Sequence, residues 1–183
     1  MGTVHDCLGT REFMAKQRYT TIDFPSYAFV PGEHPHPTRN PEGHSFRDGA
    51  PEESVPSVTP EYWRESQDYL YGADLYNFGY LWEAHEAWEG LWHVSKHDPL
   101  QAKFIQGLIQ CAAGCLKIRM GQERGMQKLF EQGVERVREV TKHAGLHYMG
   151  VDVLEFTDAI VDFGASSPQS IDGRPWLVLE SQA

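Results

Sequence analysis

The chain has 183 residues, of which 40% are hydrophobic and 12% aromatic, and its net charge is −10. This length and apolar content exclude wholesale disorder and fit one domain around a single core. The negative charge repels phosphate backbones and anionic lipids, so we expect neither nucleic acid nor a membrane as a partner. No stretch reaches the ~20 apolar residues that span a bilayer, and Met1–Lys16 lacks the apolar core of a signal peptide, which predicts a cytoplasmic protein.

The N-terminal third is rich in proline. Eight of the eleven prolines precede Glu61, and proline removes a backbone donor and breaks regular helix. We therefore expect an irregular Pro-rich arm over residues 1–58. Tyr27, Phe29 and Phe46 give this arm apolar side chains that can pack on the rest of the protein.

From Thr59 onward the apolar residues recur at helical spacing. Thr59 and Pro60 suit a helix cap and first turn, and Asp98 with Pro99 suits another. The pattern predicts an all-α, single-domain bundle of about five helices within residues 59–165, at about 59–77, 80–94, 99–121, 123–142 and 152–163. Residues 166–183 are expected to form a C-terminal tail, whose Trp176–Leu179 has extended propensity and either pairs with the Tyr27 region or covers the bundle.

The helix expected at 80–94 contains the main candidate site. On a helical wheel Leu81, His85, Trp88 and Trp92 share one face, which predicts that the imidazole of His85 lies in a buried apolar stripe. Glu89 follows one turn later, within reach of a hydrogen bond or a shared metal ion. His85 and Glu89 are therefore predicted as an acid–base pair, as metal ligands, or as a buried hydrogen-bonded pair without catalysis.

The neighbouring glutamates separate this segment from a known zinc motif. Glu83 and Glu86 project to the opposite, solvent side of the wheel. The letters His85-Glu86 resemble the start of H-E-x-x-H, but Glu89 stands where that motif needs its second histidine. A zinc site normally uses three or four protein ligands, so a metal at His85 and Glu89 needs further groups from elsewhere.

The Pro-rich arm is the candidate donor of these further ligands. His34, His36 and His44 lie close together in the sequence, and imidazole suits a divalent metal such as zinc. Prolines restrict the arm and lower the cost of ordering it. The same histidines are also explained as solvated side chains of a loop, because histidine clusters without cysteine are an unspecific signal.

The helix expected at 99–121 is apolar around most of its circumference and carries one narrow polar stripe. This stripe contains Gln106 and Gln110 together with Lys103 and Lys117. It faces either water or a polar cleft in which the two glutamines bind a ligand.

Two segments carry a resemblance to a known family. His85, Glu89 and Trp92 fit an H-x-x-x-E-x-x-W pattern, and Phe104–Gln110 reads FIQGLIQ. The sequence thereby resembles the proteins grouped as domain-of-unknown-function family 309, over roughly Ser66 to Val140. The resemblance implies a small helical bundle and no activity. It adds weight to His85, Glu89, Trp92, Gln106 and Gln110, and favours a cleft between helices 80–94 and 99–121.

Two hypotheses for the function remain open at this point. In the first, His85 and Glu89 bind a metal or a small ligand with hydrolase-like chemistry, Trp92, Gln106 and Gln110 contact the ligand, and the arm acts as a lid. In the second, the protein is a non-enzymatic interaction or structural module. The cofactor, the small-molecule or protein partner, and a homo-oligomeric state are not determined by these patterns.

Overall fold

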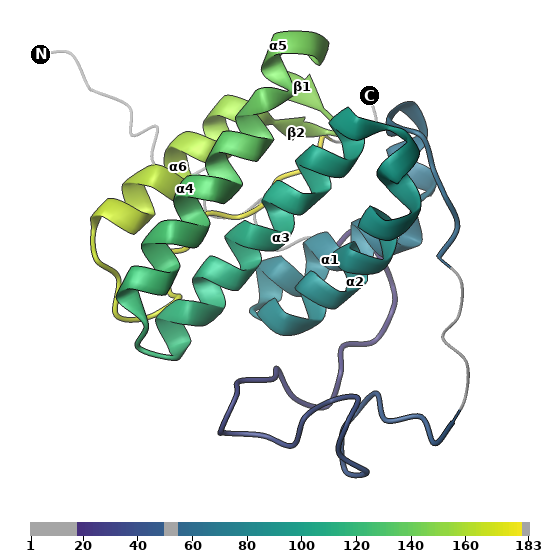
Figure 1. Cartoon of the computed structure of the whole chain (residues 1–183), viewed down its shortest axis with the longest axis vertical. Helices are drawn as coiled ribbons and strands as arrows, with labels where there is room; N and C mark the ends of the chain where they lie inside the picture. The colour runs from purple at the N-terminus through teal and green to yellow at the C-terminus, as the bar shows by residue number, and fades with distance from the viewer. Residues whose placement is uncertain (1–17, 50–54, 181–183) are drawn as a thin grey trace, which may run out of the picture.

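The computed structural model describes residues 18–49 and 55–180, so residues 1–17 and 50–54 of the expected arm and residues 181–183 of the expected tail lie outside the described residues. The predicted all-α fold is confirmed (Figure 1). Neighbouring helices pack in the order α1, α2, α3, α4 and α6. Their bounds are α1 Gln67–Phe78, α2 Leu81–Val94, α3 Pro99–Arg119, α4 Glu123–Glu139 and α6 Val153–Ala165.

Shorter elements connect the long helices. They are the 3-10 helices η1 Pro60–Glu65 and η2 Ser95–His97, the single turn α5 Thr141–Ala144, and the strands β1 His147–Tyr148 and β2 Val151–Asp152. The two strands pair antiparallel, with Tyr148 opposite Val151. Among the described residues no helix is long and apolar enough to cross a membrane.

The first predicted helix is divided into two elements at Ser66. The backbone of Ser66 is extended, with φ −81° and ψ 99°, and its side chain accepts a hydrogen bond from the amide of Tyr69. Thr59, the expected cap, makes no side-chain capping bond. Ser66 therefore starts α1, because its hydroxyl satisfies one of the amides that every helix leaves free at its N-terminus.

Trp88 fixes α2 against α1. Its indole is buried and donates a hydrogen bond to the carbonyl of Tyr69 at 3.2 Å. A Cβ atom at Gly72 would come within 2.2 Å of the indole nitrogen, so only glycine leaves room for this contact. Gly79 then ends α1 in the left-handed conformation at φ 89°, and α2 begins two residues later.

The described part of the arm forms loops beside α1 and α2 (Figure 1). Phe29 and Val30 are buried, whereas Phe46, one of the expected anchors, is exposed. On α1, the carboxylate of Asp74 accepts hydrogen bonds from the amides of Tyr19 and Thr20. The arm is thus attached by backbone hydrogen bonds to buried carboxylates as well as by apolar contact.

Within the described residues the tail does not pair with the Tyr27 region, so the first of the two alternatives for the tail is wrong. Leu179 forms a bridge with Val151 instead. The hydroxyl of Tyr19 donates to the carbonyl of Leu177 at 3.2 Å and accepts from the amide of Leu179 at 2.8 Å. These bonds join the start of the described chain to its end.

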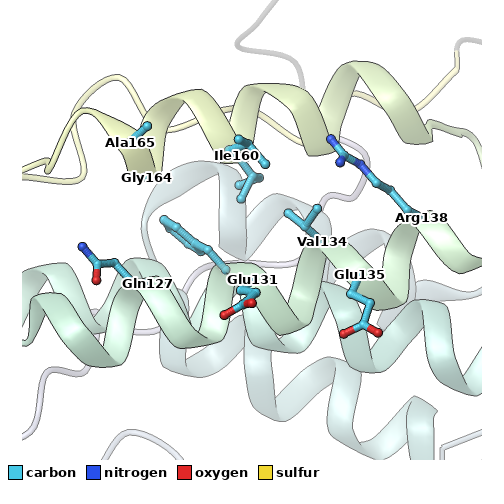
Figure 2. Close-up of a pocket in the computed structure, with 10 residues that line it drawn as sticks. Gln127, Glu131, Val134, Glu135, Arg138, Ile160, Gly164 and Ala165 are labelled. Atoms are coloured by element: carbon cyan, nitrogen blue, oxygen red, sulfur yellow. The ribbon is translucent and has the colours of Figure 1, made fainter.

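Helices α4 and α6 enclose a groove on the side of the bundle away from α1 and α2. Its volume is about 480 Å³, and Figure 2 shows its floor between the two ribbons, with Val134 on α4 and Ile160 on α6.

Candidate functional site

The buried face of α2 differs from the face predicted by the wheel. Leu81, Ala84, Trp88 and Leu91 are buried, whereas the side chain of His85 is 32% exposed. The helix is rotated by about 50° from the expected phase, given 100° per residue. The prediction that His85 and Glu89 form a buried pair is therefore wrong: they lie at the edge of the core, in contact with solvent.

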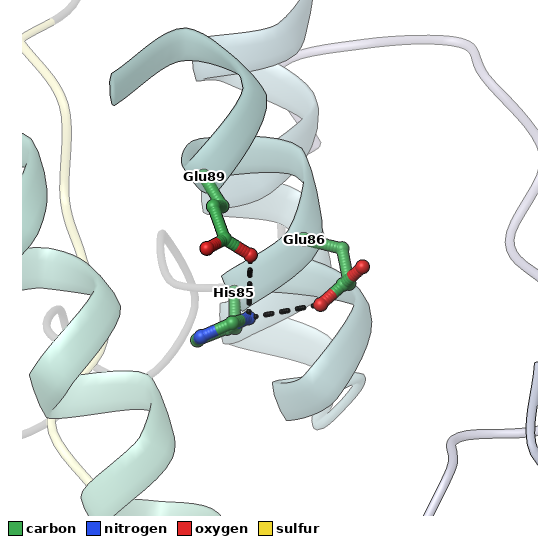
Figure 3. A group of neighbouring side chains, drawn as sticks. All are labelled: His85, Glu86 and Glu89. Carbon is green, nitrogen blue, oxygen red and sulfur yellow. Dashed lines mark hydrogen bonds and ion pairs between the residues drawn. The ribbon is translucent and has the colours of Figure 1, made fainter. Parts of the chain in front are cut away.

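His85 lies at the centre of a small cluster with two carboxylates. Its Nδ1 atom is 3.2 Å from Oε1 of Glu86 and 3.9 Å from Oε2 of Glu89. Figure 3 shows both carboxylates directed at this one ring nitrogen. Each residue offers a ligand atom, and these atoms lie within 4.8 Å of one another. Glu86 is exposed, as the wheel predicted, yet it belongs to the site.

The cluster continues along α2 toward its C-terminal end. The second oxygen of Glu89 lies 4.0 Å from Nε2 of His93. Trp92 is half-buried, and its ring contacts the ring of His93 and the ammonium of Lys96, with Nζ 4.3 Å from the ring centroid. Trp92 thus presents an aromatic surface next to the cluster.

On the opposite side of α2, the prediction that Glu83 faces solvent is wrong, because Glu83 is buried. Its Oε1 atom accepts a hydrogen bond from the amide of Phe29 at 2.8 Å. The same oxygen lies 2.9 Å from Nε2 of His44, and the two side chains are only 5% and 6% exposed. Glu83 therefore binds the arm, and the wheel missed it because the covering segment is distant in sequence.

The three arm histidines do not join His85 and Glu89. His44 binds Glu83, His36 packs against Trp82 with ring centroids 5.5 Å apart, and His34 stacks on Tyr27. Within residues 18–49 and 55–180, no hydrogen bond or ion pair links these histidines to the cluster of His85. The predicted combined metal site of His34, His36, His44, His85 and Glu89 is thus not assembled.

Gln106 and Gln110 are half-buried on α3 and are held by an arginine of α4. The guanidinium of Arg136 donates to Oε1 of Gln106 at 3.1 Å and to Oε1 of Gln110 at 3.0 Å. Gln110 also donates to Oε1 of Gln132 at 3.3 Å. Within the described part of the chain, Arg136 has no carboxylate partner, so its charge is balanced only by amide and carbonyl oxygens.

The helices that carry His85, Glu89, Gln106 and Gln110 lie in a part of the chain that matches a known protein family. Residues 69–129 match the family model described as Domain of unknown function (DUF309). The predicted resemblance is confirmed. The DUF309 segment extends from α1 to the first half of α4, and so includes His85, Glu86, Glu89, Trp92, Gln106 and Gln110. No curated protein and no solved structure matches the chain.

The DUF309 segment also contains two cysteines that take no part in the cluster. Cys111 and Cys115 are fully buried on α3. Burial raises the pKa of the Cys115 thiol to about 12 and also raises the pKa of Cys111. Because a thiol reacts through its thiolate, these side chains are inert core residues.

Arg136 is a site residue that the sequence did not reveal. It lies outside the DUF309 segment, in the last turn of α4, where Arg138 and neighbouring glutamates give the same charged pattern. Its importance depends on the packing of α4 against α3, which brings its guanidinium to the two glutamines.

Proposed function

We propose that His85, Glu86 and Glu89 bind a divalent metal ion such as zinc on the surface of α2. The observation that carries this proposal is the approach of two carboxylates to one imidazole nitrogen. Tetrahedral zinc with bonds of about 2.0–2.1 Å needs its ligand atoms about 3.3 Å apart. The 3.2 Å separation of His85 and Glu86 fits this value, and the partly exposed Glu89, at 3.9 Å, needs only a small side-chain movement.

The donor set supports a site that can act on a ligand. One imidazole and two carboxylates give three protein ligands, the number used by catalytic zinc sites that keep a position open for water. A zinc ion in such a site supplies a water with a pKa of about 7, which is the basis of metal-assisted hydrolysis. We therefore extend the proposal to hydrolase-like chemistry on a small molecule.

The remaining predicted residues receive roles in binding that small molecule. Trp92 offers an aromatic face one turn from Glu89. Gln106 accepts a hydrogen bond from Arg136 through its oxygen, and its amide nitrogen has no hydrogen-bond partner among the described residues. With Gln110, this amide and the guanidinium of Arg136 suit a polar or anionic group of the ligand. Helix α3, which carries both glutamines, packs against α2 as well as α4.

Metal titration of protein purified without a histidine tag tests the proposal. Isothermal titration with zinc chloride, and separately with manganese chloride, should show about one bound ion per chain. His85→Ala and Glu89→Gln should each weaken binding by at least about tenfold, since each removes a ligand.

His97→Ala is the matched control. His97 is exposed in η2 and is not part of the cluster, so its removal should leave the affinity unchanged. Absence of binding by the unmodified protein, or equal affinity in His85→Ala, would contradict the proposal.

A further inference from the structure

The groove between α4 and α6 is separate from the metal cluster. Its floor is formed by apolar side chains of both helices, and Figure 2 shows α6 above and α4 below this floor. Phe130, Val134 and Ile160 are already buried there, and Val161, Gly164 and Ala165 line its α6 side. Val161 is 45% exposed, so the apolar surface continues from the floor onto the edge of α6.

Two exposed apolar side chains lie on the same side of α6. Leu154, seven residues before Val161, is 39% exposed. Residues seven apart lie on nearly the same side of a helix, so Leu154 and Val161 share one side of α6, with the ion pair of Asp158 and Arg138 between them. Exposed apolar surface of this kind, bordered by charged residues, is typical of an interaction site.

The edge of α4 is acidic. Glu131 and Glu135 line the groove, are exposed, and follow one another by one helical turn. Neither forms an ion pair or a hydrogen bond with any residue in 18–49 or 55–180. At one end of the groove Arg138 is bound to Asp158 and to the hydroxyl of Thr157, so its charge is neutralised. The net charge around the groove is therefore negative.

The shape favours an elongated occupant. Lining residues on α4 extend from Gln127 to Arg138, three turns of helix, which corresponds to about 16 Å. A helix lying in such a groove inserts side chains at positions i, i+3 or i+4, and i+7. A second copy of this chain is disfavoured, because it would bring the same acidic edge and another net charge of −10 to the interface.

We propose that the α4–α6 groove binds an amphipathic helix of a partner protein, with apolar residues on the floor and lysines or arginines along Glu131 and Glu135. This interaction does not depend on the metal site of α2. It uses apolar burial for affinity and the acidic edge for the orientation of the bound helix.

A designed peptide tests this proposal on the full chain. The probe is a fluorescent peptide of about 18 residues, made of leucine, lysine and alanine, with leucines along one face and lysines along one edge. Its scrambled version has the same charge but no apolar face. We expect the amphipathic peptide to bind at least about tenfold more tightly than the scrambled one in fluorescence anisotropy, and to shift backbone NMR signals of α4 and α6.

Two protein variants separate the apolar from the electrostatic contribution. Ala165 is exposed at the edge of the groove, and Ala165→Trp should occlude it and weaken binding by about tenfold. Replacing both Glu131 and Glu135 with Gln should weaken binding by a smaller factor and reduce its dependence on salt.

The control variant replaces two other exposed glutamates, Glu42 and Glu65, with Gln and so makes the same change in net charge. It should bind as the unmodified protein does. Equal losses in both charge variants, with no effect of Ala165→Trp, would show nonspecific attraction to an acidic protein and overturn the proposal. A homodimer that Ala165→Trp dissociates in sedimentation velocity would assign the groove to a second copy and also overturn it.

Discussion

Two contacts between a histidine and a glutamate lie on different sides of α2, and the two contacts differ in burial. His44 and Glu83 lie 2.9 Å apart, with side chains 6% and 5% exposed. His85 and Glu89 lie 3.9 Å apart, with side chains 32% and 42% exposed. The first contact is closed by the arm and is part of the structure, whereas the second remains open to a ligand.

The difference shows why the kind of residue does not decide its role. A buried carboxylate must keep its partners, because losing one leaves a polar group without water. An exposed pair gains little free energy from its contact, since water screens both charges. The same two side chains can therefore hold a fold in one place and bind a ligand in another.

The largest expected effect comes from Glu83. Glu83→Ala should lower the free energy of unfolding by about 2–3 kcal/mol, because the amide of Phe29 and the ring of His44 lose their buried acceptor. Urea unfolding measures this loss, and hydrogen exchange at the amide of Phe29 should become faster. Glu86→Ala, on the same helix but exposed, should change stability by no more than about 0.5 kcal/mol. Equal losses in the two variants would remove the contrast between the two sides of α2.

The buried thiols of α3, which packs against α2, distinguish release of the arm from global unfolding. Burial raises the pKa of the Cys115 thiol to about 12 from its usual 9.0, so the unfolded chain loses this proton at a lower pH than the folded protein. Between pH 9 and 12 the unfolded state binds fewer protons, and stability falls as the pH rises. The expected loss is about 1 kcal/mol per thiol between pH 9 and 10, and nothing below pH 8.

Unfolding curves at pH 8 and pH 10 measure this loss. They use the Cys7→Ser variant, in which Cys111 and Cys115 are the remaining thiols. Replacing Cys111 and Cys115 with Ala should make the decline shallower.

At pH 8, Glu83→Ala should leave both thiols slow to react with a thiol reagent, because the arm can be released while α3 stays packed. Rapid reaction in that variant would mean that the arm and the core unfold together.

The smallest expected effect concerns His85 and Glu89. A double-mutant cycle with His85→Ala and Glu89→Ala should give a coupling energy of no more than about 0.5 kcal/mol, as expected for an exposed pair. The same cycle for His44 and Glu83 should give about 1 kcal/mol or more. A coupling of 1 kcal/mol or more at His85 would indicate that the pair is buried in solution, as the helical wheel had predicted.

The long helices could be predicted from the sequence because their signals are local. On α4, Met126, Phe130, Val134 and Val137 are buried at the predicted spacing. Asp98 caps α3 through the amides of Leu100 and Gln101. Periodicity and capping are properties of neighbouring residues, so one sequence contains enough information for them.

The phase of α2 and the composition of the site could not be predicted in this way. The wheel gave equal weight to Trp88 and Trp92, but Trp88 is fully buried against Gly72 on another helix, whereas Trp92 is only half-buried. Glu83 is buried by residues 39 and 54 positions away in the chain. Such long-range packing decides which side of a helix is covered, and no local pattern records it.

The bonds of Tyr19 have a consequence for how the chain reaches this structure. Its hydroxyl joins Leu177 and Leu179 over sequence separations of 158 and 160 residues. Helices α1 to α4 each pack on the next in sequence, so they form through short loops, whereas the link at Tyr19 closes a loop of about 160 residues. During synthesis on a ribosome the helical bundle can therefore assemble first, and the hydroxyl of Tyr19 must wait for Leu177 and Leu179 to emerge before it gains its partners.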